Sequence, residues 1–172
     1  MAESYPTFLA GQKITAALLA SAQPQVARKT ADTSRASTTT FAADPHLTFS
    51  VEANAVYIWH GWIKYFADPT PDLQVNFTAP TGALGEWHQV AAGSGATTSN
   101  TTGQSVRLES NDIVSGRNWY GVSDWDLGAV IHGTLRVAST AGTFALQWAQ
   151  ASSSATATIL YTDSWISMQR IA

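Results

Sequence analysis

The segment TFALQWAQ, residues 143–150, has the alternation that decides the fold. In an extended strand, successive side chains point to opposite faces. One face then carries the large apolar side chains of Phe144, Leu146 and Trp148. The other face carries the smaller side chains of Ala145, Gln147 and Ala149. The large row predicts a strand packed on a core. The small row predicts a close neighbour, since Ala and Gln are poor strand formers on a solvated face.

The same alternation recurs at residues 46–53 and 72–79, which predicts two more half-buried strands. Residues 55–66, AVYIWHGWIKYF, are apolar on both faces, which predicts a central strand covered on both sides. Further strands are expected at residues 105–109, 127–138, 143–151, 155–161 and 165–171. No convincing helix follows residue 37. The chain is therefore expected to be all-β, an antiparallel β-sandwich with the layout of a jelly roll.

The first 36 residues differ from the rest in character. Residues 14–22 predict one short helix, which Pro24 cannot continue. Residues 24–37 are polar and without periodicity, which is linker composition. The predicted division is an N-terminal arm and linker at residues 1–36 and a jelly-roll domain at residues 37–172.

An alternative interpretation of this start is a secretory signal. Lys13 precedes an apolar stretch that ends in Ala20, Ser21 and Ala22, a pattern of the type that signal peptidase cleaves. The stretch is Ala-rich, however, and it is preceded by Glu3 and Pro6 instead of clustered basic residues.

The composition restricts the classes of partner. The chain has 172 residues, of which 12% are charged, about half of the roughly 25% usual in soluble domains. Such a chain has little charge to spread over a free surface, so much of its surface is expected to be covered by other subunits. The net charge of −3 and the scattered basic residues predict neither nucleic acid nor an anionic membrane as a partner. The absence of Cys excludes disulfides and thiolate metal sites.

Three markers carry a resemblance to a known family. They are Leu-Thr-Phe-x-Val-Glu-Ala at residues 47–53, Phe-Thr-Ala-Pro-x-Gly at residues 77–82, and Leu-Gln-Trp-Ala-Gln at residues 146–150 followed by an Ala/Ser/Thr stretch. With the opening FLAGQKITAALLASAQP, they make the chain similar to virion structural proteins, usually described as minor tail proteins, of phages and prophages of actinobacteria, whose small C-terminal domain this sandwich resembles. The likeness covers most of the chain and is weakest at residues 93–126. The family's layout is in turn similar to trimeric jelly rolls of the TNF and complement-head kind, which is an analogy of fold alone.

This resemblance implies a homotrimer located in the virion and assembled in the host cytoplasm. The small row of Ala145, Gln147 and Ala149 would then lie at the threefold axis, where three copies approach closely. The arm would anchor the subunit to other virion proteins through its apolar side chains: Phe8, Leu9, Ile14, Leu18 and Leu19. The alternative for the small row is a partly solvated face of a monomer.

No motif for catalysis is found. Asp124 and Asp126 flank Trp125, with Glu86 elsewhere in the chain, and paired carboxylates are typical of glycoside hydrolysis, but this spacing also suits turn residues that bind backbone amides. The four histidines, His46, His60, His88 and His132, show no metal-ligand spacing. There is no Gly-x-Ser-x-Gly elbow, and the glycines of residues 91–103 form no phosphate loop. The chain is expected to be no enzyme and to hold no cofactor or metal.

Recognition by loops is the competing function. Aromatic and polar residues of the irregular stretch 84–126 are candidates to contact a host surface glycan, because exposed rings stack on sugars. These candidates are Trp87, Trp119, Tyr120, Trp125, Asp124 and Asp126. The alternative for each Trp is that it closes the end of the sandwich.

Three functional hypotheses follow. The first is a small trimeric minor tail or fibre-like component of a phage. The second is a capsid-decorating or head-fibre protein of the same arm-and-domain design. The third is a secreted carbohydrate-binding module, which requires the signal interpretation of residues 13–22. The sequence does not distinguish the tail from the capsid, nor does it identify a receptor.

Overall fold

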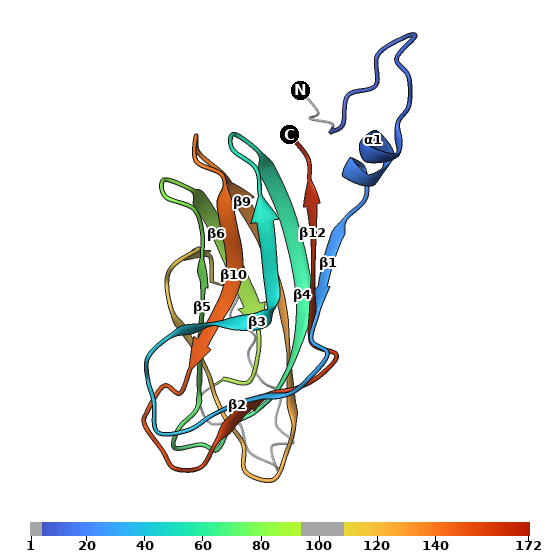
Figure 1. The fold of residues 1–172 in the computed structure, drawn as a ribbon. Coiled ribbons are helices and arrows are strands. Elements are labelled where there is room, and N and C mark those ends of the chain that lie inside the picture. Colours follow the sequence, from blue (N-terminus) through green and yellow to red (C-terminus); the bar gives the residue numbers. More distant parts are fainter. Residues whose placement is uncertain (1–4, 94–108) are drawn as a thin grey trace.

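The fold is a sandwich of two antiparallel sheets with a short N-terminal projection (Figure 1). The computed structural model describes residues 5–93 and 109–172. Nearly all regular structure in these residues is β-strand, and the one helix is α1 (Ala16–Ser21). The expected all-β antiparallel sandwich is confirmed.

The two sheets differ in size. The large sheet has the order β1 (Gln25–Arg28), β12 (Trp165–Arg170), β4 (Val56–Phe66), β9 (Leu127–Arg136), β6 (Leu84–Val90) and β7 (Asn111–Asp112). Beside this path, β11 (Thr158–Leu160) joins β4 to β2 (Thr33–Arg35). The small sheet has the order β3 (Ala42–Val51), β10 (Gly142–Ala149), β5 (Leu73–Thr78) and β8 (Arg117–Trp119).

The strand order is that of a jelly roll. The four strands β1, β12, β4 and β9 face the four strands β3, β10, β5 and β8, and the chain crosses repeatedly between the two sheets as it runs from β1 to β12. A jelly roll consists of eight strands in two such sheets. The strands β6 and β7 extend the large sheet beyond β9.

The core lies between the sheets and has an aromatic centre. Trp59 of β4 packs on Phe77 of β5 and Phe144 of β10, with ring centroids 4.7 and 5.5 Å apart. Phe77 and Phe144 are stacked at 5.1 Å. Gly133 on β9 makes room for Trp59, because a Cβ at this glycine would lie 2.3 Å from the indole. The large row of residues 143–150 thus faces the core, as expected.

The arm before the sandwich is shorter than expected. Strands β1 and β2 occupy residues 25–28 and 33–35, so the interpretation of residues 24–37 as a linker is wrong. Their sequence lacked an apolar row because β1 lies at the edge of its sheet, where only Ala27 packs on the core. The arm therefore ends near Pro24, and the following strands belong to the sandwich.

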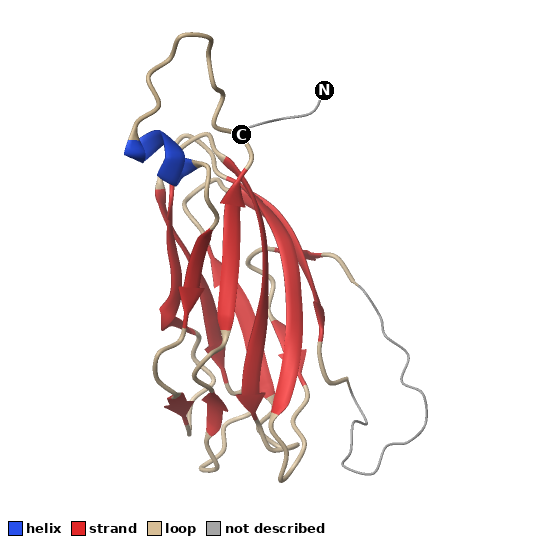
Figure 2. Cartoon of the chain, turned by 90° about the vertical axis from the view of Figure 1, so that its right-hand side faces the viewer, coloured by secondary structure: helices blue, strands red, loops and turns tan. Residues whose placement is uncertain are grey.

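The helix of the arm begins at Ala16 and ends at Ser21, within the predicted residues 14–22. The hydroxyl of Thr15 caps it by accepting a hydrogen bond from the Leu18 amide. Helix and preceding loop project beyond one end of the sandwich, near the C-terminus (Figure 2). Among the described residues, no helix is both long and apolar enough to span a membrane.

Other strand predictions had mixed outcomes. The strands expected near residues 46–53, 55–66, 72–79, 127–138, 143–151, 155–161 and 165–171 are present, with shifted ends. Most of the strand expected at residues 105–109 lies outside the described residues. The stretch 84–126, interpreted as irregular, contains β6, β7 and β8.

Candidate functional site

Two of the four aromatic residues proposed for glycan contact lie in the core. Trp87 on β6 and Trp119 on β8 are 1% and 0% exposed. The Trp87 indole packs edge-on against Phe77 and donates a hydrogen bond to the Asp112 carbonyl. The Trp119 ring lies 5.6 Å from that of Tyr65. The prediction that these rings are stacking platforms is therefore wrong, because no sugar can reach them.

The remaining loop residues stay accessible. Trp125 is 57% exposed and follows Asp124, whose φ of 68° marks a tight turn. Tyr120 is half-buried, and its carbonyl accepts a hydrogen bond from the Tyr65 hydroxyl. This turn presents one aromatic ring beside exposed carboxylates, and its role in glycan contact stays a prediction.

Glu86 and Asp126 lie too far apart to act as a catalytic pair. Asp126 forms an ion pair with Lys64 at 2.7 Å, and this contact holds the pKa of Asp126 below its usual range, the reverse of what a general acid needs. Glu86 pairs with Thr134, eight residues along β9 from Asp126, which places the two carboxylates about 27 Å apart at roughly 3.4 Å per residue. Glycoside hydrolysis requires a separation of about 5 to 10 Å.

The small row on β10 is mostly covered within one copy. Ala145 and Ala149 are 1% and 0% exposed, and only Gln147 reaches the surface of the small sheet. The two alanines therefore have no free surface to offer to a second copy. A trimer contact through Gln147 stays a prediction.

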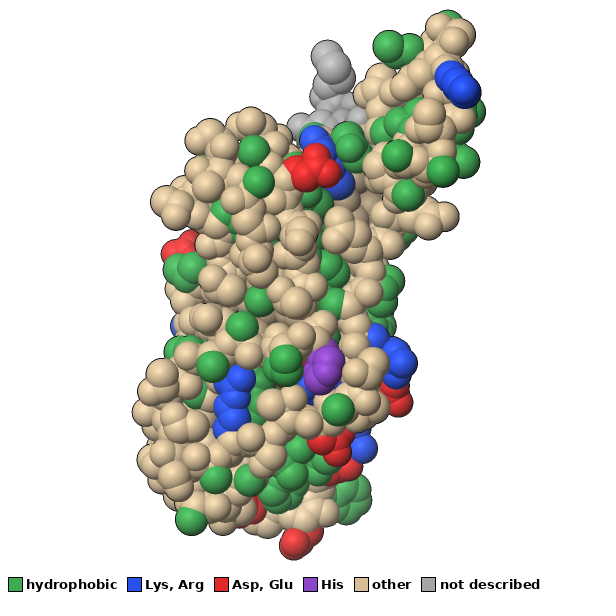
Figure 3. Space-filling model, viewed as in Figure 1, with side chains coloured by type: hydrophobic (Ala, Val, Ile, Leu, Met, Phe, Trp, Pro, Cys, Tyr) green, Lys and Arg blue, Asp and Glu red, His purple; other side chains and the backbone are tan. Residues whose placement is uncertain are grey.

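The anchor residues of the arm are mostly exposed. Phe8, Leu9, Ile14 and Leu19 each expose more than half of their surface, while Leu18 is half-buried. Figure 3 shows hydrophobic side chains scattered over this projection. Their role as an anchor stays a prediction.

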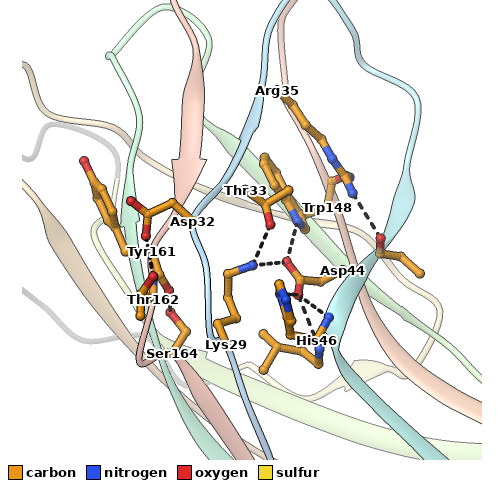
Figure 4. Close-up of polar contacts among 12 residues, drawn as sticks. Lys29, Asp32, Thr33, Arg35, Asp44, His46, Trp148, Tyr161, Thr162 and Ser164 are labelled. Carbon is orange, nitrogen blue, oxygen red and sulfur yellow. Dashed lines mark hydrogen bonds and ion pairs between the residues drawn. The ribbon is translucent and has the colours of Figure 1, made fainter.

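A buried ion pair ties the first strands to the sandwich (Figure 4). Lys29 and Asp44 contact each other at 2.7 Å, and both side chains are fully buried. The ammonium also donates to the Thr33 hydroxyl, and the carboxylate accepts from the Trp148 indole and the His46 amide. These contacts join residues before and within β2 to β3 and β10, so the cluster serves the fold.

The outer face of the large sheet differs from a normal solvated face. We use this name for the side chains that point away from the core in three rows across the strands. The first row is Arg28, Trp165, Trp62, Val130 and Val90. The second row is Val26, Ser167, His60, His132 and His88. The third row is Gln169, Ile58, Thr134, Glu86 and Asp112.

Three histidines lie side by side in the middle row. The ring of His132 stacks on those of His60 and His88, with centroids 6.1 and 5.2 Å apart. The Trp165 ring meets His60 edge-on at 5.5 Å. Burial and the repulsion of the two neighbouring imidazoles lower the pKa of His132 below its usual value. Within this row, His132 is therefore held toward its neutral form.

A shallow hollow of about 430 Å³ lies beside this row, lined among others by Ile58, Glu86, His88 and Ser110. Ser110 donates a hydrogen bond to the Glu86 carboxylate at 2.6 Å. No group of three His, Cys, Asp or Glu side chains in the described part of the chain could hold a metal ion. The stacked imidazoles thus offer a surface and not a coordination site.

The sequence placed His60 and His132 in strands but did not bring the three histidines together. Their meeting depends on the register in which His60, His132 and His88 occupy directly paired positions. The segment containing His88 was not recognised as a strand. A search for histidines at matching positions of paired strands would have found the row only after β6 was known.

Comparisons of the chain with protein-family models, with curated proteins and with solved structures give no match. The functional argument therefore depends on the chain's own residues and on the geometry described above.

Proposed function

We propose that the chain is a structural subunit of a phage particle, a small homotrimeric minor tail or fibre-like component that is anchored by its N-terminal arm. The jelly roll would project from the particle, and the arm would dock on a neighbouring virion protein. The family resemblance of residues 47–53, 77–82 and 146–150 supports the virion assignment.

The exposed apolar arm is the observation that carries this proposal. A helix of 6 residues with no buried side chain is not stable alone in water. Phe8, Leu9, Ile14 and Leu19 gain nothing from the sandwich, since each is mostly exposed. Four large apolar side chains, each more than half exposed on one short projecting segment, would gain from burial in a partner.

Removal of residues 1–22 tests the arm. The truncated chain keeps β1 and all later strands, so it should fold as the full chain does. It should be absent from purified particles of the phage or prophage that encodes it, while the full chain is present. Incorporation of the truncated chain at the level of the full chain would contradict the proposal. A matched control is Lys13→Ala, which changes the arm without removing an apolar side chain.

The capsid-decorating alternative uses the same arm and the same jelly roll. Electron microscopy of particles that carry a labelled C-terminus distinguishes the two, because the label lies on the tail in one case and on the head in the other.

A second candidate function is contact with host glycan through the exposed turn at Trp125. The Trp125 ring is 57% exposed and lies between Asp124 and Asp126 in the chain. An exposed aromatic ring beside carboxylates is suited to stacking on a sugar and binding its hydroxyls. Binding of isolated host cell-wall glycan to the wild type and to Trp125→Ala tests this function.

A further inference from the structure

The outer face of the large sheet carries several large apolar side chains among its polar ones: Val26, Ile58, Trp62, Val90, Val130 and Trp165. An antiparallel sheet with one solvated face normally alternates apolar and polar residues. Here β4 carries Ile58, His60 and Trp62 on its outer side, and its neighbour β9 carries Val130. Ile58 and Val130 are 45% and 41% exposed. The sequence predicted that this strand is covered on both sides, and a single copy covers only one.

We propose that copies of this chain associate through the outer face of the large sheet, and that the row of His60, His132 and His88 weakens this association as the pH falls. The inference rests on the proposed homo-oligomer and specifies its interface. It moves that interface from the β10 row of the small sheet to the opposite side of the sandwich.

The size of the face suits a second copy. Five strands from β1 to β6, about 4.8 Å apart, and three rows, about 6.8 Å apart, give a flat area of about 500 Å². Side-chain relief adds to this figure. Together with an equal area on a second copy, the face would bury about 1,000 Å² in total, which is the lower limit for a specific interface, so the face suits a weak association.

The chemistry of the face also suits a second copy. A neutral imidazole has one donor and one acceptor nitrogen, so the row can exchange hydrogen bonds with the facing surface of a neighbouring copy. Two cations at the margin are neutralised within the copy: Arg28 pairs with Asp163, and Lys64 pairs with Asp126. The middle row carries no Asp, Glu, Lys or Arg, so a strongly charged partner would find no counter-charge there.

The titratable groups around the histidines come from each strand of the face. Strand β6 contributes Glu86 and β7 contributes Asp112, while β9 contributes Arg136, β4 contributes Lys64 and β1 contributes Arg28. Strand β12 presents Trp165, Ser167 and Gln169, none of which titrates near neutral pH. Among these groups, Glu86 is the acidic residue closest in sequence to the three histidines. It lies two residues before His88 on β6 and points to the same side of the sheet.

The direction of the pH effect follows from burial. An imidazole with an ordinary pKa of about 6.5 is neutral above this value and can be buried against another copy. Below this pH, the imidazoles are protonated, so each copy must release these protons before it associates. Adjacent imidazolium ions also repel one another. The association is thus complete above neutral pH and is lost as the pH falls through the histidine range.

Sedimentation equilibrium of the full chain at about pH 7.5 and about pH 5 tests the proposal. The dissociation constant of the wild type should rise by about tenfold or more on acidification. Val130→Asp should leave a folded monomer that still unfolds in one cooperative thermal transition, at a melting temperature lowered by the lost association. Two control variants place the same charge on the small sheet. They are Ser50→Asp on β3 and Gln147→Asp on β10, in the row that the sequence analysis placed at the threefold axis. Both should associate as the wild type does.

The triple variant His60→Gln, His88→Gln and His132→Gln tests the role of the histidines. A Gln side chain also donates and accepts hydrogen bonds, but it does not titrate. The triple variant should associate with little dependence on pH. If it associates too weakly to compare, His132→Gln alone must still reduce the pH dependence. A wild type that is monomeric at neutral pH, a Val130→Asp variant that associates normally, or an unchanged constant at low pH would each overturn the proposal. None of these outcomes depends on the arm.

Discussion

Lys29 and Asp44 form an ion pair of 2.7 Å in which neither side chain has any exposed surface. Lys29 directly follows β1, and Asp44 lies in the bulge where β3 changes register against β10. The pair therefore joins the two sheets at the point where the chain enters the sandwich. Nearby, Arg35 lies over the Trp148 ring at 4.0 Å and donates to the Trp148 carbonyl, which fixes β2 in the same place.

Lys29→Met should destabilise the fold strongly. The change leaves the Asp44 carboxylate buried without its counter-charge, which costs about 3 to 5 kcal/mol of unfolding free energy. The matched control is Arg28→Ala, which removes the exposed pair with Asp163 and should cost less than about 1 kcal/mol. Urea denaturation measures both, and equal effects for the two variants would contradict the structural role of the buried pair.

Two truncations should separate the arm from the sandwich. Deletion of residues 1–22 should leave the unfolding free energy unchanged, because α1 buries no side chain. Deletion of residues 1–34 removes β1 together with Lys29, and it should yield an unstable or insoluble chain. Thermal melting of the two products is the measurement. A stable product of the longer deletion would restore the sequence-based boundary at residue 36.

Trp119 and Trp125, which the sequence analysis assigned to loops, should differ in their effect on the free energy of unfolding. Trp119→Ala empties a fully buried site and should cost about 3 to 5 kcal/mol. Trp125→Ala changes an exposed ring and should stay within about 0.5 kcal/mol of the wild type. Chemical denaturation compares them. A loss of less than about 1 kcal/mol of unfolding free energy in Trp119→Ala would show that this ring is not part of the core.

His132 should titrate below the ordinary histidine range. Burial and its two imidazole neighbours lower its pKa, so the His88→Gln variant should raise the midpoint of His132 by removing one of these causes. The stability that depends on neutral His132 is present above about pH 6.5 and is lost as the pH falls below that value. NMR titration of the ring protons follows each midpoint. A His132 midpoint that does not move in His88→Gln would show that the rings do not interact.

The alternation of large apolar side chains with small or polar ones predicted the strands whose two faces differ most in hydrophobicity. β5 and β10 were expected from their rows of large apolar residues, and both lie in the interior of the small sheet. β4 was expected from its length and apolar content, and it lies in the middle of the large sheet. Each of these strands carries its own periodic signal, so no knowledge of its partners was needed.

The remaining elements depend on partners far along the chain. β1 and β2 have polar sequences and gain their place from pairing with β12 and β11. Lys29 is buried because Asp44 meets it, which no local pattern indicates. Trp87 and Trp119 were assigned to loops because Gly, Ser and Thr surround their short strands, yet tertiary packing covers both rings. The histidine row likewise arises from register.

The mass of the intact wild-type chain in solution at neutral pH tests the central claim most directly, because both the proposed homotrimer and its proposed interface require the chain to associate. Light scattering at micromolar concentration should report about three times the 18.3 kDa of one chain. A mass of 18.3 kDa, with the outer face of the large sheet left in water, would contradict the account.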